Sequence, residues 1–316
     1  MNSSVRERVV RFGARNSLAG ILSTSREARP GLPFVVIVNA GIIHRVGPNR
    51  LYVDVARAVA ALGYPVLRFD LAGLGDSDVM SSEASLLESA MLDVKAAFDY
   101  LTSAHNATTF LAFGLCSGAN YAALAAFNEP RVIGVLLIDP TVARTRWSMM
   151  VHIGRRLRNL STLRSLLTLR HPVFQRRGGR TRSVAVARAA EGQSGQRAEP
   201  ALERLSPDDS RRSLEQLVER AVHLMFVFTG GVNHVYNYRN QLYDLLPGFD
   251  FHGLLRLEYM PDTDHTVSDG RGRRQLLESI RAWLTNAFPG GRAPGTAGPA
   301  AVEGTHEAVG RAGESS

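Results

Sequence analysis

The sequence is poor in cysteine and almost devoid of lysine. Cys116 is the only cysteine among 316 residues, so the chain cannot form an internal disulfide. A protein without disulfides fits a reducing compartment, and we therefore expect a cytoplasmic location with the Cys116 thiol free for chemistry. Lys95 is the only lysine, so arginine supplies nearly all the positive charge behind a formal net charge of +8.

Long hydrophobic runs are also missing. The longest apolar stretches, such as 132–138, have the length of a β-strand, whereas a helix that spans a bilayer needs about 20 apolar residues. The N-terminal residues 1–11 are polar and have no apolar signal segment, so we expect neither a transmembrane segment nor export by that route. The hydrophobic fraction of 45% is that of a soluble globular protein.

What the sequence does contain is an alternation of apolar strands and amphipathic helices. Two short strands joined by a glycine turn predict an N-terminal hairpin, and continuous β-branched runs predict strands buried on both faces. The predicted strands are 5–12, 17–23, 33–40, 65–70, 109–115, 132–139, 222–229 and 254–260. The predicted helices are 51–62, 86–102, 117–127, 207–220, 237–246 and 271–288. This order predicts an α/β fold with a mostly parallel central sheet flanked by helices.

The alternation stops after Pro140. Residues 141–205 contain an arginine-rich amphipathic stretch and no predicted strand, so we interpret them as a helical cap inserted after the sixth strand. Residues 1–140 and 206–288 then form the core. Residues 289–316 are rich in glycine, alanine and proline without periodicity, which predicts a disordered tail.

A G-x-C-x-G segment lies between a predicted strand and a predicted helix. Its residues are Gly114, Leu115, Cys116, Ser117 and Gly118. At such a turn the central residue is forced into a strained conformation, and the flanking glycines approach too closely for a Cβ atom. The sulfur of Cys116 would therefore be exposed at the carboxyl edge of the sheet, in front of a helix N-terminus that stabilises negative charge.

With these residues the sequence resembles the α/β-hydrolase superfamily, in its branch of serine aminopeptidases and monoacylglycerol lipases. Asn39, Ala40, Gly41, His44 and Tyr52 resemble that branch's "HG-x…H…Y" segment. Residues 70–77 resemble its D-x-x-G-x-G-x-S turn. The sequence departs from the branch in two places: cysteine replaces the usual serine, as in dienelactone hydrolases and polyhydroxyalkanoate synthases, and Asn39-Ala40 replaces His-Gly.

The resemblance implies a base, an orienting residue and an oxyanion hole. The histidine of this fold follows the last strand, which is where His265 stands. The orienting residue usually follows the seventh strand, where Asn233 stands, and we prefer Asn233 because a Cys–His pair functions with an asparagine. Asp139, after the preceding strand, is the alternative. The oxyanion hole would consist of the backbone N–H groups of Gly41 and Ser117.

No metal site and no organic cofactor is expected from the sequence. Residues 141–190 contain twelve arginines and no aspartate or glutamate. An acid-free basic surface attracts anions, so a carrier-protein phosphopantetheine arm or coenzyme A is a candidate partner. Nucleic acid is not expected, because no recognised nucleic-acid motif accompanies the charge.

These features predict an acyl-transfer enzyme, a thioesterase, esterase or acyltransferase, that works through an acyl-Cys116 intermediate with His265 as general base and acid. Two alternatives stay open. One is a hydrolase of small lactones or esters like the dienelactone hydrolases. The other is a catalytically silent hydrolase fold that serves as a binding protein.

Overall fold

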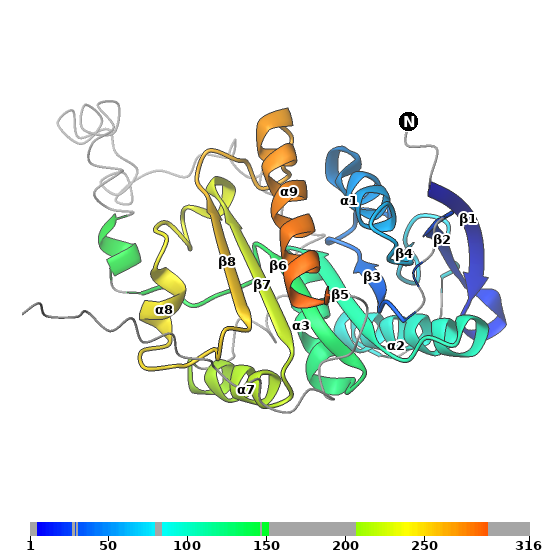
Figure 1. Cartoon of the computed structure of the whole chain (residues 1–316), viewed down its shortest axis with the longest axis horizontal. Helices are drawn as coiled ribbons and strands as arrows, with labels where there is room; N and C mark the ends of the chain where they lie inside the picture. The colour runs from blue at the N-terminus through cyan, green and yellow to red at the C-terminus, as the bar shows by residue number, and fades with distance from the viewer. Residues whose placement is uncertain are drawn as a thin grey trace, which may run out of the picture.

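The computed structural model describes residues 5–26, 29, 31–79, 84–145, 147–151 and 207–289. Its centre is an eight-stranded sheet in the order β1-β2-β4-β3-β5-β6-β7-β8 (Figure 1). Strand β2 pairs in antiparallel fashion with both β1 and β4. All other neighbouring pairs, from β4–β3 to β7–β8, are parallel. The mostly parallel sheet predicted from the alternation of strands and helices is confirmed, and so is the α/β-hydrolase fold that the family resemblance implies.

The strands lie close to their predicted positions. Their bounds are β1 Val5–Phe12, β2 Leu18–Ser25, β3 Phe34–Val38, β4 Val66–Phe69, β5 Phe110–Leu115, β6 Val132–Ile138, β7 His223–Thr229 and β8 Leu255–Met260. The helices are α1 Leu51–Ala60, α2 Leu86–His105, α3 Ser117–Asn128, α7 Pro207–Glu219, α8 Gln241–Leu245 and α9 Gly270–Ala287. Strands β4 and β5 are buried along their whole length, as continuous apolar runs predict.

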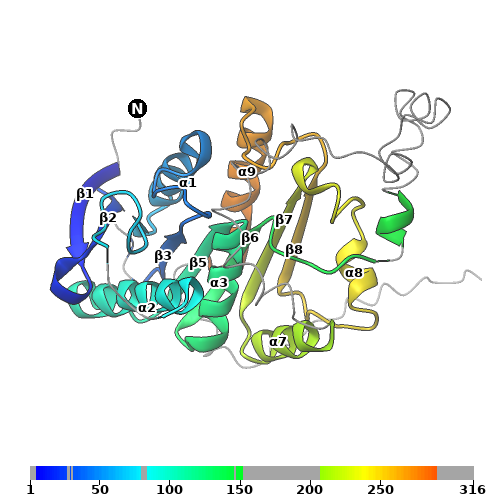
Figure 2. The ribbon, with the colours of Figure 1, turned by 180° about the vertical axis from the view of Figure 1, so that it is seen from behind.

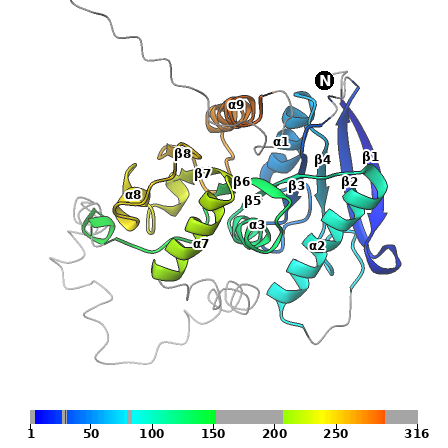
Figure 3. The same ribbon diagram turned by 60° about the horizontal axis from the view of Figure 1, so that its bottom comes forward.

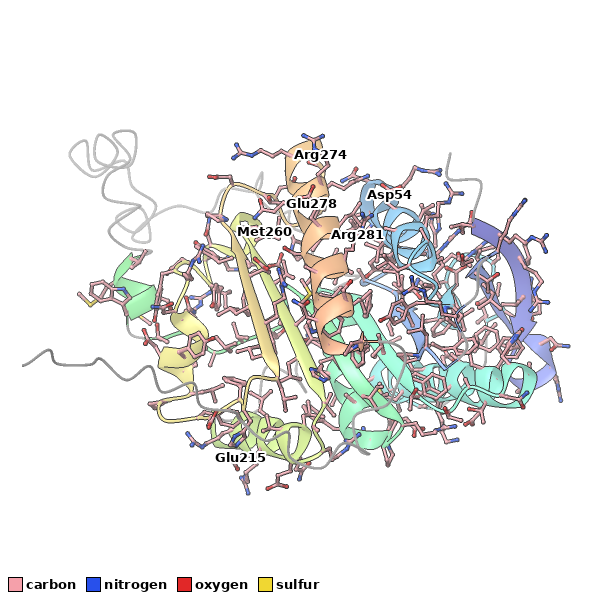
Figure 4. The ribbon with its side chains drawn as sticks, viewed as in Figure 1. Asp54, Glu215, Met260, Arg274, Glu278 and Arg281 are labelled. Carbon is pink, nitrogen blue, oxygen red and sulfur yellow. The ribbon has the colours of Figure 1, made fainter. Side chains whose placement is uncertain are left out.

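The helices cover both faces of the sheet, as the tilted view in Figure 3 shows. Helices α1 and α9 lie on one face, and α2, α3 and α7 lie on the other. Each face has its own cluster of buried apolar side chains. Asp54 on α1, labelled in Figure 4, accepts a 2.7 Å hydrogen bond from Arg273 and so links α1 to α9.

One predicted helix is shorter than expected. The sequence predicts a helix over 237–246, but α8 begins only at Gln241. The preceding loop is held in another shape: the backbone N–H of Asn237 donates to Gln241 Oε1 at 3.0 Å, and the ring of Tyr236 stacks on Phe228 with centroids 3.6 Å apart. Tyr236 is fully buried in this loop.

Most of the predicted cap lies outside the described residues. The structure describes residues 141–145 and 147–151 of the predicted cap, and residues 147–151 are helical. This short helical segment lies beside α8, near the β8 end of the sheet (Figure 2). Asn237 Nδ2 donates to Ser148 O at 2.8 Å, and Thr145 Oγ1 and Tyr238 Oη are 3.0 Å apart. The predicted tail lies outside the described residues from 290 onward.

Within the described part of the chain, no helix combines the length and the apolar character needed to cross a bilayer.

Candidate active site

Cys116 occupies the turn between β5 and α3. Its backbone has φ 57° and ψ −123°, a conformation that L-residues rarely adopt. A Cβ atom on Gly114 would lie 2.1 Å from the Gly118 carbonyl oxygen, and one on Gly118 would lie 2.4 Å from Asn39 O. Both flanking glycines are therefore required by close backbone approach. Cys116 itself is exposed, as predicted for the central residue of this turn, residues 114–118, which we call the elbow.

Two hydrogen bonds from backbone N–H groups hold the end of β5 in place at the elbow. The Cys116 N–H donates to Ile138 O at 2.8 Å, which continues the pairing of β5 with β6. The pairing of β5 with β3 ends at Gly114, opposite Val38, and beyond it the Leu115 N–H donates to the Tyr52 hydroxyl at 3.1 Å. Tyr52 is buried, and burial raises the pKa of its phenol above the usual range. It therefore stays neutral and serves as a fixed acceptor.

His265 lies in the loop after β8, whose last residue, Met260, is labelled in Figure 4. Its Nδ1 is 2.7 Å from Asp139 Oδ2, and Cys116 lies near enough to the ring to raise its pKa. The hydrogen bond with Asp139 and, after it, the interaction with Cys116 raise the pKa of His265 to about 10 although burial opposes this. The three side chains thus lie in one row.

Asp139 is the innermost member of the row. It follows β6 with φ 48°, and its carboxylate is fully buried. Besides His265, it accepts hydrogen bonds from Thr229 N at 2.7 Å and from Thr229 Oγ1 at 2.6 Å. Hydrogen bonds from donors compensate the burial of a charged carboxylate, and here they also fix its orientation. Thr229 was not among the predicted site residues, although its place at the end of the neighbouring strand is a usable signal.

The preference for Asn233 as the partner of His265 is corrected by this geometry. Asn233 follows the turn Gly230–Val232, and its Oδ1 accepts a 3.4 Å hydrogen bond from the Tyr259 hydroxyl. The imidazole instead meets Asp139, which the sequence analysis kept as the alternative. The loop after β7 turns sharply at two glycines, and this turn leads the Asn233 side chain toward Tyr259 on β8.

The same two glycines make room for the histidine loop. A Cβ atom on Gly230 would lie 2.0 Å from Pro261 O, and one on Gly231 would lie 2.3 Å from His265 N. The Gly230 N–H also donates to Thr263 O at 2.8 Å. The loop after β7 therefore contributes to the site as a backbone surface against which the histidine loop rests.

The predicted oxyanion-hole residues lie close together. Gly41 follows β3 with φ 53°, and its N–H donates to Ser117 Oγ at 2.6 Å. Asn39, which stands where the family branch has histidine, is buried and holds this loop: its Nδ2 donates to Ile43 O at 2.8 Å, and its Oδ1 accepts from Leu71 N at 3.1 Å. The hydrogen bond from Gly41 holds the Ser117 side chain against the loop after β3.

A second buried carboxylate lies beside the Gly41 loop. Asp70, directly after β4, accepts from the Arg45 N–H at 2.6 Å and from the Asp76 N–H at 3.0 Å. The Arg45 guanidinium forms ion pairs with both Asp70 and Asp76. This network ties the loop after β3 to the loop after β4.

No group of three or more His, Cys, Asp or Glu side chains that could hold a metal ion occurs among the residues the structure describes. The imidazole of His265 instead meets the carboxylate of Asp139. An exposed thiol beside a histidine is able to perform nucleophilic and general acid–base chemistry.

Comparison with solved structures finds the same fold at low sequence identity. A putative α/β hydrolase of unknown function from Agrobacterium tumefaciens is 13% identical with a TM-score of 0.53, covering 92% of this chain and 100% of that one. An esterase from Pyrococcus furiosus is 12% identical with a TM-score of 0.53, covering 89% and 91%. An α/β serine hydrolase homologue from Coxiella burnetii is 10% identical with a TM-score of 0.51, covering 88% and 96%.

At these identities the structures establish a shared fold. A search of the curated proteins finds no match to the sequence. The profile of the family described as "Serine aminopeptidase, S33" matches residues 35–209, more than half of the chain, and this span includes the elbow and Asp139. The chain therefore belongs to the S33 serine aminopeptidase family of hydrolases.

Proposed function

We propose that this protein transfers acyl groups from an ester or thioester through a covalent acyl-Cys116 intermediate. His265 acts as general acid and base, and Asp139 positions His265. The observation that carries the proposal is the row of side chains that runs from the exposed Cys116 through His265 to the buried Asp139. A nucleophile, a base and a third group that orients the base are the components of acyl-transfer catalysis.

In the acylation step the sulfur of Cys116 attacks while His265 holds the proton. The pKa of His265 is about 10, so the ring holds a proton at neutral pH, and its charge lies beside the sulfur. The sulfur attacks the carbonyl carbon, a C–S bond forms, and the C=O electron pair moves onto oxygen. The bond to the leaving group then breaks, and the leaving group takes the proton from Nε2 of His265.

In the second step the same histidine acts as a base. The ring has given its proton to the leaving group in the first step, so it is able to accept a proton from water or from an alcohol or amine. The hydrogen bond between Nδ1 and Asp139 keeps the ring in position for this transfer. Attack of that acceptor breaks the C–S bond and leaves the sulfur free and the proton on His265.

The Asp139 contact weakens the reading of the chain as a silent binding protein. That reading drew on a neutral orienting residue, whereas the ring of His265 faces a carboxylate. Carrier-protein or coenzyme A binding remains a proposal that rests on the arginines of 141–190, which lie largely outside the described residues.

A substrate panel tests the proposal. Wild type and Cys116→Ala are assayed with p-nitrophenyl acetate, butyrate and octanoate, with acetyl- and octanoyl-coenzyme A, and with alanine p-nitroanilide because of the family match. We expect turnover of esters or thioesters, an acyl mass increment on the wild type, and neither in the variant. An increment that water removes indicates a hydrolase, and one removed only by added amine or alcohol indicates a transferase. Equal rates in both proteins would contradict the proposal.

A further inference from the structure

We propose that the side-chain hydroxyl of Ser117 is a catalytic hydrogen-bond donor to the oxyanion and that the N–H of Gly41 holds it in place. This inference rests on the proposed acyl-Cys116 chemistry. It assigns a role to a side-chain atom that the steps described above do not use. The observation behind it is the 2.6 Å hydrogen bond from Gly41 N to Ser117 Oγ, which joins residues 76 apart in the sequence.

The bond changes the composition of the oxyanion hole. In the arrangement that the resemblance implies, the Gly41 N–H points at the substrate oxygen. Here that N–H already has an acceptor, the Ser117 hydroxyl oxygen. The group that faces the substrate from this side of the elbow is then the hydroxyl.

The hydroxyl is suited to donate. A serine hydroxyl has one proton to give and can accept at its oxygen at the same time. Its oxygen accepts from Gly41, and among the described residues its own proton has no recorded acceptor. Donation from Gly41 also polarises the O–H bond and strengthens it as a donor.

Its position next to the nucleophile fits this role. Ser117 directly follows Cys116 and is the first residue of α3, so its backbone N–H is one of the helix N–H groups without an intrahelical partner. When the sulfur attacks a carbonyl, the C=O electron pair moves onto oxygen. The N–H and the O–H of Ser117 both donate to that oxygen, and they release it when the carbonyl re-forms and the leaving group departs.

An alternative role makes the opposite prediction. If the hydroxyl only occupies the hole until substrate arrives, its removal frees the Gly41 N–H to bind the oxyanion directly. Ser117→Ala would then acylate as fast as wild type or faster. If the hydroxyl instead stabilises the sulfur, its removal would slow every reaction of Cys116.

The experiment compares two reactions of the same sulfur. Acylation by p-nitrophenyl acetate, followed as a burst of p-nitrophenolate, forms an oxyanion, whereas alkylation by iodoacetamide forms none. For Ser117→Ala we expect acylation slowed about 10²-fold and alkylation unchanged. Ser117→Thr, which keeps a hydroxyl, is expected to recover most of the rate. Ser103→Ala is the matched control, because among the described residues its hydroxyl on α2 bonds only Tyr100 O of its own helix.

Three results would overturn the inference. Undiminished acylation in Ser117→Ala supports the placeholder role instead, and an equal loss in acylation and alkylation assigns the hydroxyl to the sulfur. A wild type that alkylates at Cys116 but shows no acyl-Cys116 with any activated ester contradicts the proposed function itself, and the inference with it.

Discussion

Asp70 and Asp139 both follow strands at the carboxyl edge of the sheet, and both carboxylates are fully buried. Asp70 is paired with the Arg45 guanidinium, which stays charged at every relevant pH. Asp139 is held by Thr229 and pairs with the imidazole of His265, a group that can both bind and release a proton. Similar burial therefore accompanies two kinds of pair: the Asp70 pair joins two loops, and the Asp139 pair, in the proposed mechanism, positions the group that transfers a proton.

The largest effect that separates the two carboxylates is expected in catalysis. Asp139→Asn removes the charge that supports the imidazolium and lowers the pKa of His265, so kcat/KM should fall by about 10²- to 10⁴-fold. Steady-state kinetics on the best ester of the panel measures this loss.

Asn233→Ala is the matched control for Asp139→Asn. It removes only a 3.4 Å hydrogen bond from Tyr259, so we expect kcat/KM to stay within about threefold of wild type. Equal losses in the two variants would show that His265 does not depend on Asp139.

A second catalytic prediction concerns the nucleophile. Cys116→Ser places a hydroxyl before a His–Asp pair, so it should retain more activity than Cys116→Ala. We expect kcat/KM about 10²-fold below wild type, because the serine hydroxyl must lose its proton to His265 during attack. Wild-type rates in Cys116→Ser would contradict the role given to the sulfur in acylation.

The Asp70 side of the comparison predicts a loss of stability. Asp70→Asn leaves the Arg45 guanidinium, whose side chain is 18% exposed, without its buried partner. We expect the free energy of unfolding to fall by about 2 to 3 kcal/mol, measured in urea. The kcat/KM of folded Asp70→Asn should fall much less than that of Asp139→Asn. A larger loss of kcat/KM in Asp70→Asn than in Asp139→Asn would contradict the roles given to the two carboxylates.

The smallest expected effect is a difference in pH dependence. The pKa of His265 is raised from 6.5 to about 10, so its contribution to stability is complete below pH 6.5 and is lost as pH rises toward 10. The stability difference between wild type and Asp139→Asn should therefore shrink over that window. The difference for Asp70→Asn should stay flat, since Arg45 does not titrate there. Urea unfolding at several pH values measures both stability differences. The same pH dependence in the two variants would contradict the pairing of Asp139 with a titrating His265.

The framework of the site could be predicted from sequence because local rules specify it. Two glycines around Cys116 are needed wherever a strand turns tightly into a helix, and Gly114 and Gly118 meet that need in the structure. The placement of His265 after the last strand is what the resemblance to the α/β-hydrolase superfamily implies. Burial and periodicity likewise place the strands to within a few residues.

The choice between Asn233 and Asp139 depended on long-range geometry. Both residues follow neighbouring strands at the same edge of the sheet, so sequence position alone does not decide which one reaches the imidazole. The decision is made by φ 48° at Asp139 and by the tight packing of Gly230 and Gly231 against the histidine loop. Two chemical signals were available: a carboxylate is a stronger acceptor than an amide, and Thr229 supplies two donors to it.

The orientation of the Ser117 side chain was beyond sequence reasoning for the same reason. Its hydroxyl meets Gly41, which comes from a loop after a different strand. The position of that loop depends on Asn39 and on the ion pair of Arg45 with Asp70. Contacts of this kind form only when distant segments come together.

The most direct test of the central claim is to locate the acyl group on the protein. The chain is mixed with the p-nitrophenyl ester that reacts fastest, quenched in acid within the burst, digested, and mapped by peptide mass spectrometry. We predict a single acylated peptide that carries its modification on Cys116 and is absent from Cys116→Ala. An acyl group on Ser117 or on any other side chain, with Cys116 unmodified, would contradict the account.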